Sequence, residues 1–521
     1  MAISPASELR ENASVQGVDP KQSRFLKLLA PDAAWILSAI AVLFALLLGD
    51  GVGRLFRDSD TGWHVRSGEA MLRSMSLPRT DPYSFSKPGE IWFAWEWGAD
   101  VLMAAAHRWD GLRGVAVLYL TLLAAASWTW FRLHWSYGGN FFLACAMASP
   151  MLTTLSLHWL ARPHVFGWLL ALLALLAFEK APARFRIGHA AALVAFGAVW
   201  ANLHASFFFL PALALLFLAG EGLRSLLWGE HGFRVRWFAL AALFSAAGTL
   251  INPYGLALHG HIWNYLNNRE LLARVGEFQS FNFHVEGATQ ILMVVAIAMA
   301  GGTLALLERR PHHLLLCLGL AVLSLRSARV LPLLALLALP PANAAITGAL
   351  RTLQLAPRLR ARLDGFLAYS ERLCKIDARC GGYALAPVGL LVMVALLNSP
   401  AIAAQTGFPP REFPVAAAGA LDKLPAGIIL LAPDKYGGYL IYRFAGHRKV
   451  FMDGRSDFYG VAFMKAYIRL IEARPGWREQ VVKIGFTHAL LPNQYSLVAG
   501  LEDWGWKRIY RDEVATLLAR D

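Results

Sequence analysis

Apolar runs of membrane-spanning length recur from residue 32 to residue 398 of the chain. An α-helix needs roughly 17–25 consecutive, mostly apolar residues to cross the hydrocarbon core of a bilayer. Charged residues make up only 16% of the sequence, against roughly 25% in a soluble chain, and 57% of the residues are hydrophobic. These features predict an α-helical polytopic membrane protein with about eleven transmembrane helices. The runs lie at residues 32–50, 112–133, 140–158, 165–179, 188–203, 206–222, 237–252, 288–307, 312–326, 329–347 and 382–398.

The basic residues provide an independent test of this topology. Cytoplasmic loops of membrane proteins collect Lys and Arg, which also accounts for the net charge of +14 without a nucleic-acid partner. If residues 1–31 form a cytoplasmic tail, the basic clusters between the runs all fall on the cytoplasmic side, including the largest, Arg351–Arg379. An odd number of spans then places the C-terminal segment outside. The tail lacks the apolar core and cleavage site of a signal peptide, so we expect the first run to be an uncleaved span.

The segment from residue 401 to residue 521 has the composition of a soluble protein. Short apolar runs bounded by Gly, Pro and Asp are typical of strands, and apolar residues at helical spacing indicate a helix. The predicted elements are strands at Ile428–Ala432, Lys449–Met452 and Ala489–Leu491 and a helix at Phe463–Ala473. We therefore expect a small α/β domain at 401–521, after a transmembrane domain at 32–400 whose first outer loop covers residues 50–111.

The first outer loop carries the residues with the strongest indication of chemistry. Asp58, Asp60 and His64 follow the first apolar run directly, and Glu96 lies between two tryptophans near the end of the loop. Ionisable residues at a membrane boundary cost desolvation energy and are usually kept for function. An aspartate here is suited to act as general base for an acceptor hydroxyl, with His64 and Glu96 orienting it. Asp58, Asp60 and His64 are also potential ligands of a divalent cation such as Mg²⁺ or Mn²⁺, although their spacing does not demand a metal.

Structural roles are open for the same residues. Asp58 is well placed to cap a helix that begins near Thr61, and Glu96 has a second interpretation as part of an aromatic belt at the membrane interface. His64 alone is compatible with an ordinary interfacial histidine. The functional interpretation rests on the gathering of carboxylates, histidines and arginines on one predicted face of the membrane.

Other ends of the predicted spans add polar residues to the outer face. Arginine donates two hydrogen bonds from a planar, permanently charged fork, which suits the phosphate of a lipid-linked donor. The candidates for donor phosphate binding are Arg162, Arg326 and Arg329, although the last two have an alternative role in snorkelling to lipid headgroups. The candidates for substrate binding in these turns are His164, Asn202, His204, Asn252 and Tyr254.

The C-terminal segment contains a dense polar motif of its own. Asp453, Arg455 and Asp457 follow the predicted strand at Lys449–Met452, and loops after strands often carry functional residues. We include these three residues among the substrate-binding candidates. A structural Asp/Arg pair that locks the loop explains the motif equally well. If the loop folds down over the membrane face, it forms the upper wall of the candidate site.

The first loop and the topology resemble those of the GT-C superfamily of multi-pass glycosyltransferases. In that superfamily an aspartate shortly after the first span acts as catalytic base or metal ligand, and Asp58 and Asp60 occupy the matching place. The chain is more closely similar to bacterial membrane proteins that share an Asp-x-Asp-x-x-Trp-His first loop. The motifs that match are Asp58–His64, Asp81–Ser84, Trp95–Trp97, Asn252–Gly255 and the C-terminal Gly-Gly-Tyr and Asp-Gly-Arg segments. Better-known members have Asp-Glu or Trp-Asp instead of Asp-x-Asp, so the base stays open between Asp58 and Asp60.

This resemblance implies a bacterial inner-membrane glycosyltransferase with a cytoplasmic N-terminus and a periplasmic C-terminal domain. It would move a sugar from a polyprenyl-phosphate donor, held among membrane lipids, to a hydroxyl of a glycan, protein or lipid acceptor on the periplasmic side. Three alternatives are open. They are a flippase or transporter for a lipid-linked sugar, an arginine-based polysaccharide ligase or polymerase, and a non-catalytic envelope assembly protein.

Overall fold

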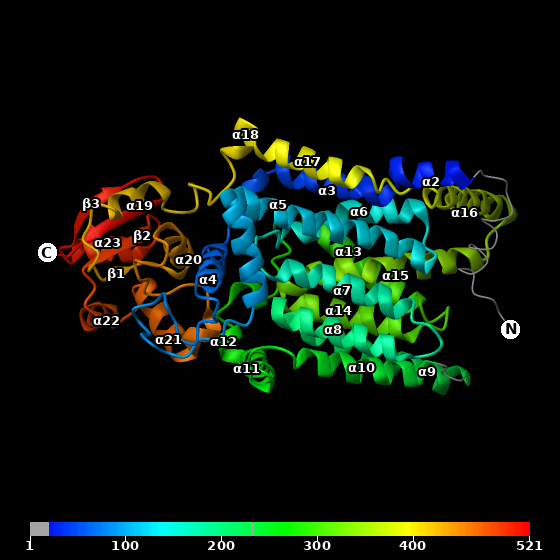
Figure 1. Ribbon diagram of the computed structural model, residues 1–521, viewed down its shortest axis with the longest axis horizontal. Coiled ribbons are helices and arrows are strands. Elements are labelled where there is room, and N and C mark those ends of the chain that lie inside the picture. Colours follow the sequence, from blue (N-terminus) through cyan, green and yellow to red (C-terminus); the bar gives the residue numbers. More distant parts are fainter. Residues whose placement is uncertain (1–19, 231–233, 521) are drawn as a thin grey trace.

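The computed structural model describes residues 20–230 and 234–520 and consists mainly of helices. A bundle of long helices forms one end of the molecule, and a small mixed domain forms the other (Figure 1). Residues 1–19 of the predicted cytoplasmic tail lie outside the described residues. The rest of the tail contains helix α2, Pro20–Leu29.

Eleven apolar helices build the bundle within the described ranges, and each overlaps one of the predicted runs. Four segments are long and apolar enough to cross a membrane by themselves, at Arg24–Leu47, Trp97–Tyr137, Ala205–Trp228 and Ala328–Thr352, and seven more are shorter. The helices are α3 Ala33–Leu47, α5 Trp97–Tyr137, α6 Phe141–Ser156, α7 His164–Glu179, α8 Ile187–Leu203, α9 Phe209–Trp228, α10 Val235–Thr249, α13 Ala288–Leu304, α14 Pro311–Arg326, α15 Leu331–Thr352 and α17 Leu385–Leu397. The prediction of a multi-pass helical membrane protein is thus confirmed.

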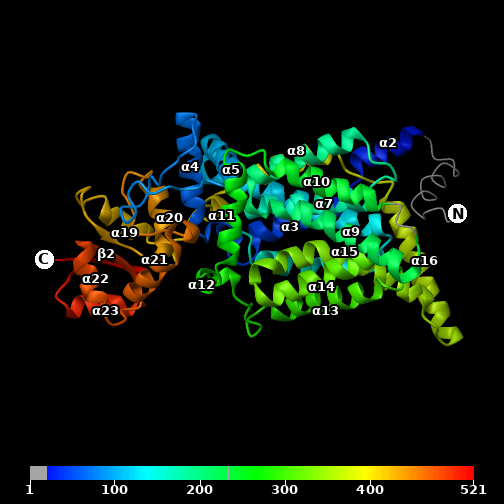
Figure 2. The same ribbon diagram turned by 90° about the horizontal axis from the view of Figure 1, so that it is seen from below.

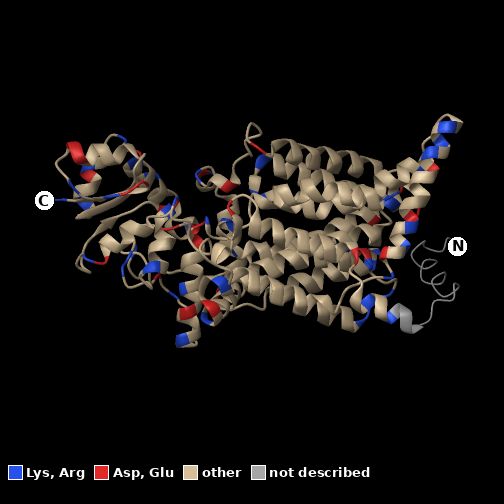
Figure 3. Ribbon diagram, turned by 90° about the horizontal axis from the view of Figure 1, so that it is seen from above, with Lys and Arg blue, Asp and Glu red and all other residues tan. Residues whose placement is uncertain are grey.

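Helix α15 lies inside the bundle and α3 on its outside. Most of the apolar part of α15 is buried against α5, α6, α13 and α14. By contrast, Ile36, Ile40 and Leu43 of α3 are exposed, as expected of side chains that face lipid. Charged residues are sparse along the bundle and gather at its two ends and in the C-terminal domain (Figure 3).

Helix α5 is 41 residues long and bends where the predicted first loop ends. Asp110 and Gly111 have non-helical backbone angles, and Gly111 has φ of 55°, a conformation that glycine adopts without strain. The segment before the bend packs on α4, Asp60–Ser74, and the segment after it enters the bundle. The shorter elements between and after the spans are η2 Gly51–Phe56, η3 Ala205–Phe208, α11 Leu256–Asn267, α12 Arg269–Leu272, η4 Gly276–Phe278, η5 Ala328–Val330, α16 Pro357–Asp377 and α18 Pro400–Ala403.

The C-terminal domain contains a four-stranded sheet in the order β1-β2-β4-β3, which confirms the predicted α/β domain. Strand β1 pairs parallel to β2, and β4 pairs antiparallel to both β2 and β3. The strands are β1 Leu430–Leu431, β2 His488–Pro492, β3 Lys507–Arg511 and β4 Ala515–Ala519, with helices α19 Val415–Leu421, α20 Asp434–Arg443, α21 Ser456–Ile471, α22 Trp477–Ile484 and α23 Ser496–Asp503.

Two of the three predicted strands are present, and the one at Lys449–Met452 is wrong. Val450 forms an isolated parallel bridge with Ser84 of the first outer loop instead of joining the sheet. The apolar residues of this segment are buried all the same, because the loop supplies a partner that the sheet does not. The predicted helix at Phe463–Ala473 corresponds to α21.

The first outer loop and the C-terminal domain share one hydrophobic core. Trp63, Tyr83 and Trp92 of the loop pack with Tyr439 and Leu440 of α20 and with other buried residues of the domain. Helices α4 and α20 lie side by side in both views (Figures 1 and 2). They approach so closely that a Cβ atom on Gly62 would lie 2.2 Å from the carbonyl oxygen of Gly438. This packing brings the start of α4 against the C-terminal domain, where the candidate site lies.

Candidate active site

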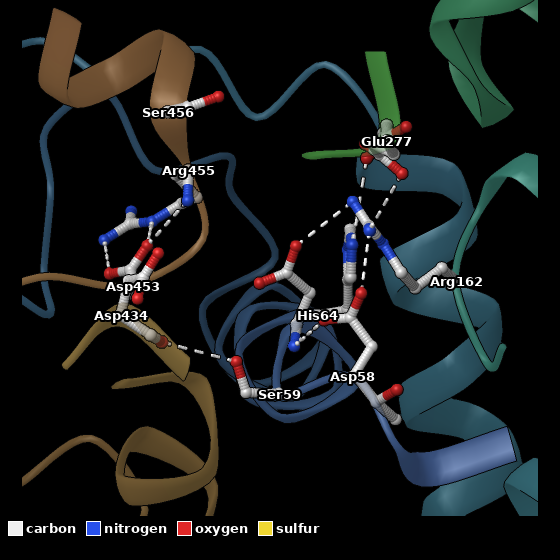
Figure 4. A network of polar contacts seen from close by, with 12 residues as sticks. Asp58, Ser59, His64, Arg162, Glu277, Asp434, Asp453, Arg455 and Ser456 are labelled. Atoms are coloured by element: carbon white, nitrogen blue, oxygen red, sulfur yellow. Dashed lines mark hydrogen bonds and ion pairs between the residues drawn. The ribbon is translucent and has the colours of Figure 1, made fainter. Parts of the chain in front are cut away.

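The site begins at the first turn of α4. Asp60 is the first residue of the helix, and its backbone N–H donates a 2.9 Å hydrogen bond to Oδ1 of Asp58. This bond matches the capping role that the sequence left open for Asp58. The other oxygen, Oδ2, lies 2.8 Å from Nη1 of Arg162. Asp58 therefore both holds the start of α4 and joins the charged cluster drawn in Figure 4.

Arg162 is the centre of this charged cluster. It lies in the turn before α7 and contacts Asp58, Asp60 at 3.1 Å and Glu277 of η4 at 3.7 Å. Arg329 also pairs with Glu277. Burial alone would raise the pKa of Glu277, but the charges of Arg329 and Arg162 hold it at about 2. Three segments of the membrane domain thus meet through one guanidinium group.

Asp60 faces the C-terminal domain on its other side. A Cβ atom on Gly454 would lie 2.0 Å from Oδ1 of Asp60, so only a glycine permits this approach. Burial and then the nearby charge of Asp58 raise the pKa of Asp60 to about 8, although Arg162 opposes this shift. Asp60 is consequently a carboxyl group that gains and loses its proton in a pH range that suits a general base.

A second row of ionisable groups continues behind Asp60 in the interior. Nδ1 of His64 lies 2.6 Å from Oδ1 of Asp100, and Nε2 of His64 lies 3.8 Å from Glu96. Nε2 of His204 approaches the other oxygen of Glu96 at 3.4 Å. Burial raises the pKa of Glu96 to about 7 and, with the charge of Arg162, lowers the pKa of His64 well below its usual value. A carboxyl group that titrates near neutrality therefore lies between two imidazole nitrogens.

Asp100 is a member of the site that the sequence analysis missed. It lies in the first turn of α5, four residues after Glu96, and is almost completely buried. Residues four apart share a helix face, so the spacing from Glu96 offered a signal. The close approach of α5 to α4 also depends on Gly68, where a Cβ atom would lie 1.9 Å from the carbonyl oxygen of Asp100.

The Asp-Gly-Arg loop forms a wall of the site, and its charged residues are engaged with one another. Nη2 of Arg455 lies 2.7 Å from Asp453 and 2.9 Å from Asp81 of the first loop, and its guanidinium carbon lies 4.8 Å from the centre of the Trp92 ring. These buried contacts match the structural alternative for the Asp/Arg pair. Asp457 pairs with His261 of α11 at 3.1 Å.

The remaining predicted residues lie around the cluster and make local contacts. The Asn202 amide donates to the carbonyl oxygen of Ile251, Oδ1 of Asn252 accepts from the backbone N–H of Tyr254, and the Tyr254 hydroxyl accepts from the N–H of Ala94. His164 bonds to the carbonyl oxygen of His158. Arg326 is exposed at the end of α14 and makes no ion pair or hydrogen bond within the described residues. The structure thus brings some of the predicted residues together in the cluster and gives the others local contacts around it.

The three predicted metal ligands do not converge on one point. Arg162 lies between Asp58 and Asp60, and Nδ1 of His64 faces Asp100. In the part of the chain that the structure describes, a different set of residues has metal-ligand spacing, namely Glu179, His312 and His313 at the far end of the bundle. The arrangement around Arg162 therefore does not fit a divalent cation, and we derive no chemical step through one.

Comparisons with known proteins support the fold. No protein-family model and no curated protein sequence matches the chain. Among solved structures, the apo oligosaccharyltransferase of Archaeoglobus fulgidus superposes with a TM-score of 0.51 at 12% identity, over 88% of this chain and 69% of that chain. Apo ArnT from Cupriavidus metallidurans superposes with a TM-score of 0.45 at 15% identity, over 93% and 96% of the two chains. The likeness to the oligosaccharyltransferase shows that the two chains share a fold, and it concerns the fold alone.

Proposed function

We propose that the chain is a GT-C-type glycosyltransferase of the bacterial inner membrane, with its C-terminal domain in the periplasm. It transfers a sugar from a polyprenyl-phosphate donor to a hydroxyl of a glycan, protein or lipid acceptor. The observation that carries this proposal is the cluster of Asp58, Asp60, Glu96 and Arg162, which is partly or fully buried between the first outer loop, the membrane bundle and the C-terminal domain. Figure 4 shows Asp58 and Arg162 of this cluster. The fold shared with an oligosaccharyltransferase is consistent with it.

The two first-loop aspartates have different surroundings, and these support different roles. Asp58 accepts a backbone N–H and binds Arg162, so it positions the start of α4. Asp60 has the raised pKa and the closer contact with the C-terminal domain, which favours it as general base. The acceptor O–H loses its proton to the Asp60 carboxylate as its oxygen bonds to the anomeric carbon. The bond from that carbon to the phosphate oxygen breaks, and polyprenyl phosphate leaves with inversion at the sugar.

We propose Arg326 as the arginine that meets the donor phosphate. Its side chain is exposed at the end of a membrane helix and has no ionic partner within the described residues. Arg162 and Arg329 already contact carboxylates. A phosphate would have to compete with those carboxylates for Arg162, whereas Arg326 needs no such exchange.

The test is sugar transfer or release from a panel of radiolabelled polyprenyl-phosphate sugars by the purified protein in lipid nanodiscs. We would compare the wild type with Asp58→Asn, Asp60→Asn and the control Asp422→Asn, which changes an exposed carboxylate of the C-terminal domain. We expect turnover to fall at least about 100-fold in Asp60→Asn and to be unchanged in the control.

Two results would contradict this proposal. Equal turnover in the wild type and in both first-loop variants would exclude an aspartate base. The second result is that neither the wild type nor any variant turns the donor over, while the wild type binds it saturably and Arg326→Ala does not. That result would favour a flippase for the same lipid-linked sugar.

A further inference from the structure

A second cluster of ionisable side chains lies at the other end of the bundle. Glu179 is the last residue of α7, and His312 and His313 lie in the first turn of α14. Helix α7 begins at His164, two residues after Arg162, and its 16 residues extend over about 24 Å. The cluster is therefore separate from the candidate active site. Figure 3 shows charged residues gathered at that end of the bundle.

The three side chains have the spacing of metal ligands. Oε2 of Glu179 lies 3.3 Å from Nε2 of His313 and 3.9 Å from Nε2 of His312. All three ligand atoms lie within 4.8 Å of one another. Ligand atoms bound to one zinc ion at about 2.0–2.1 Å in tetrahedral geometry are about 3.3 Å apart. A direct ionic hydrogen bond usually brings nitrogen and oxygen to about 2.7–2.9 Å, so the hydrogen bond between His313 and Glu179 at 3.3 Å is a long one.

The surroundings hold these side chains in place. The His313 side chain is 1% exposed, and its ring packs edge-on against Tyr137 with 5.1 Å between ring centres. The His312 ring stacks on Phe217 at 4.7 Å. The second oxygen of Glu179 lies 3.4 Å from Nη1 of Arg310, which orients the carboxylate with Oε2 toward the histidines. Both imidazoles thus present Nε2 to the same oxygen atom.

Tyr137 provides a separate indication of a missing partner. Its side chain is buried, and its hydroxyl has no hydrogen-bond partner within the described residues. Buried hydroxyl groups are nearly always bonded, so an unpaired one calls for an explanation. A metal with three protein ligands keeps a fourth position for water, and such a water is a candidate partner for the hydroxyl of Tyr137, whose ring packs on His313.

We propose that Glu179, His312 and His313 bind one transition-metal ion, with zinc as the best match. Two imidazoles and one carboxylate suit zinc, whereas Mg²⁺ and Ca²⁺ prefer oxygen ligands. The ion clamps the end of α7 to the start of α14. A metal-free network is the alternative, in which Arg310 pairs with Glu179 and the histidines donate their Nε2–H groups to its other oxygen. This proposal does not depend on the proposed glycosyltransferase activity.

The test is metal analysis of tag-free protein in nanodiscs, by X-ray fluorescence and by titration with zinc chloride against a chromophoric chelator. The variants are Glu179→Gln, His313→Asn and His312→Gln, and the last changes a residue that is less deeply buried than His313. The control is His284→Gln, an exposed histidine outside the cluster. We expect about one zinc ion per chain in the wild type and the control, and near-zero zinc in the three variants.

The outcomes separate the proposal from its alternatives. Folding is checked by monodisperse elution, and His312→Gln serves if the other variants aggregate. Zinc binding that falls at least about tenfold in His312→Gln supports the site. A wild-type protein that binds no zinc overturns the proposal, and so does zinc that all cluster variants retain. Zinc lost only on substitution of Asp60 would place the metal at the candidate active site instead.

Discussion

A single added methyl group tests whether the C-terminal domain sets the position of Asp60. In Gly454→Ala the new Cβ atom would lie 2.0 Å from Oδ1 of Asp60 and 2.7 Å from its Cγ. Ordinary contacts to carbon lie at about 3.5 Å, so either the carboxylate or the loop must retreat by roughly 1–1.5 Å. The loop is poorly able to retreat, because Arg455 is buried between Asp453 and Asp81. We therefore expect Asp60 to move.

The size of the effect follows from that displacement. A catalytic group misplaced by about 1 Å can lose about 100-fold in rate, and overpacking typically costs about 1–3 kcal/mol of stability. We expect transfer from the polyprenyl-phosphate sugar to fall about 100-fold in Gly454→Ala while the protein still folds. Initial rates in nanodiscs and thermal unfolding would be measured side by side.

A matched control is available in the same domain. Gly419 of α19 also changes to alanine, but nothing lies within 4 Å of the position of its Cβ atom. We expect Gly419→Ala to keep the wild-type rate and an unfolding temperature equal to or slightly above that of the wild type, because alanine favours a helix more than glycine does. A wild-type rate and stability in Gly454→Ala would refute the inference that this loop fixes the general base.

Three further predictions concern the charged groups of the site. Because the pKa of Asp60 is raised to about 8, turnover should increase as the pH rises from 6 to 9. The protonated form of Asp60 contributes stability at low pH, and this contribution should be lost as the pH rises through about 8. Rates and unfolding free energies measured at each pH test the two predictions. Asp100→Asn should reduce turnover by about 100-fold with little change in unfolding temperature, because His64 loses the carboxylate that orients it; the wild-type rate would contradict this role. Arg162→Met should lower stability by about 3–5 kcal/mol, measured by denaturant unfolding, since it leaves buried carboxylates unpaired, whereas the exposed Arg326→Met should change it little.

The membrane helices were predictable because their signal is local. Lipid contact requires apolar side chains along a whole helix, so composition alone marks the span, even for α7 with its 16 residues. The C-terminal strands give a weaker signal. Strand β3, Lys507–Arg511, lies at the edge of the sheet with mostly exposed side chains and shows no clear alternation. The predicted strand at Lys449–Met452 is apolar because it is buried against the first outer loop, and the sequence does not reveal which segment covers it.

In the candidate site too, the positions of residues next to a span were predictable, and contacts between distant segments were not. The sequence placed Asp58, Asp60 and Arg162 on one face, since each follows or precedes a recognisable span. It did not reveal that both aspartates share the guanidinium group of Arg162, because that contact joins segments about a hundred residues apart. Asp100 was missed for a related reason: its spacing from Glu96 was visible in the sequence, but its contact with His64, 36 residues away, was not.

Asp60 and the first outer loop join the membrane domain to the C-terminal domain in the structure. Burial is the largest cause of the raised pKa of Asp60, and Gly454 contributes to that burial through its contact with the carboxylate. The core that joins Trp63 and Trp92 to α20 holds this contact in place. If the C-terminal domain moved away to admit an acceptor, water would reach Asp60 and its pKa would fall toward the ordinary value. Movement of the C-terminal domain away from Asp60 would therefore make Asp60 a weaker base. Closure of the domain over a bound acceptor would restore the raised pKa, so that proton transfer is favoured only when the site is complete.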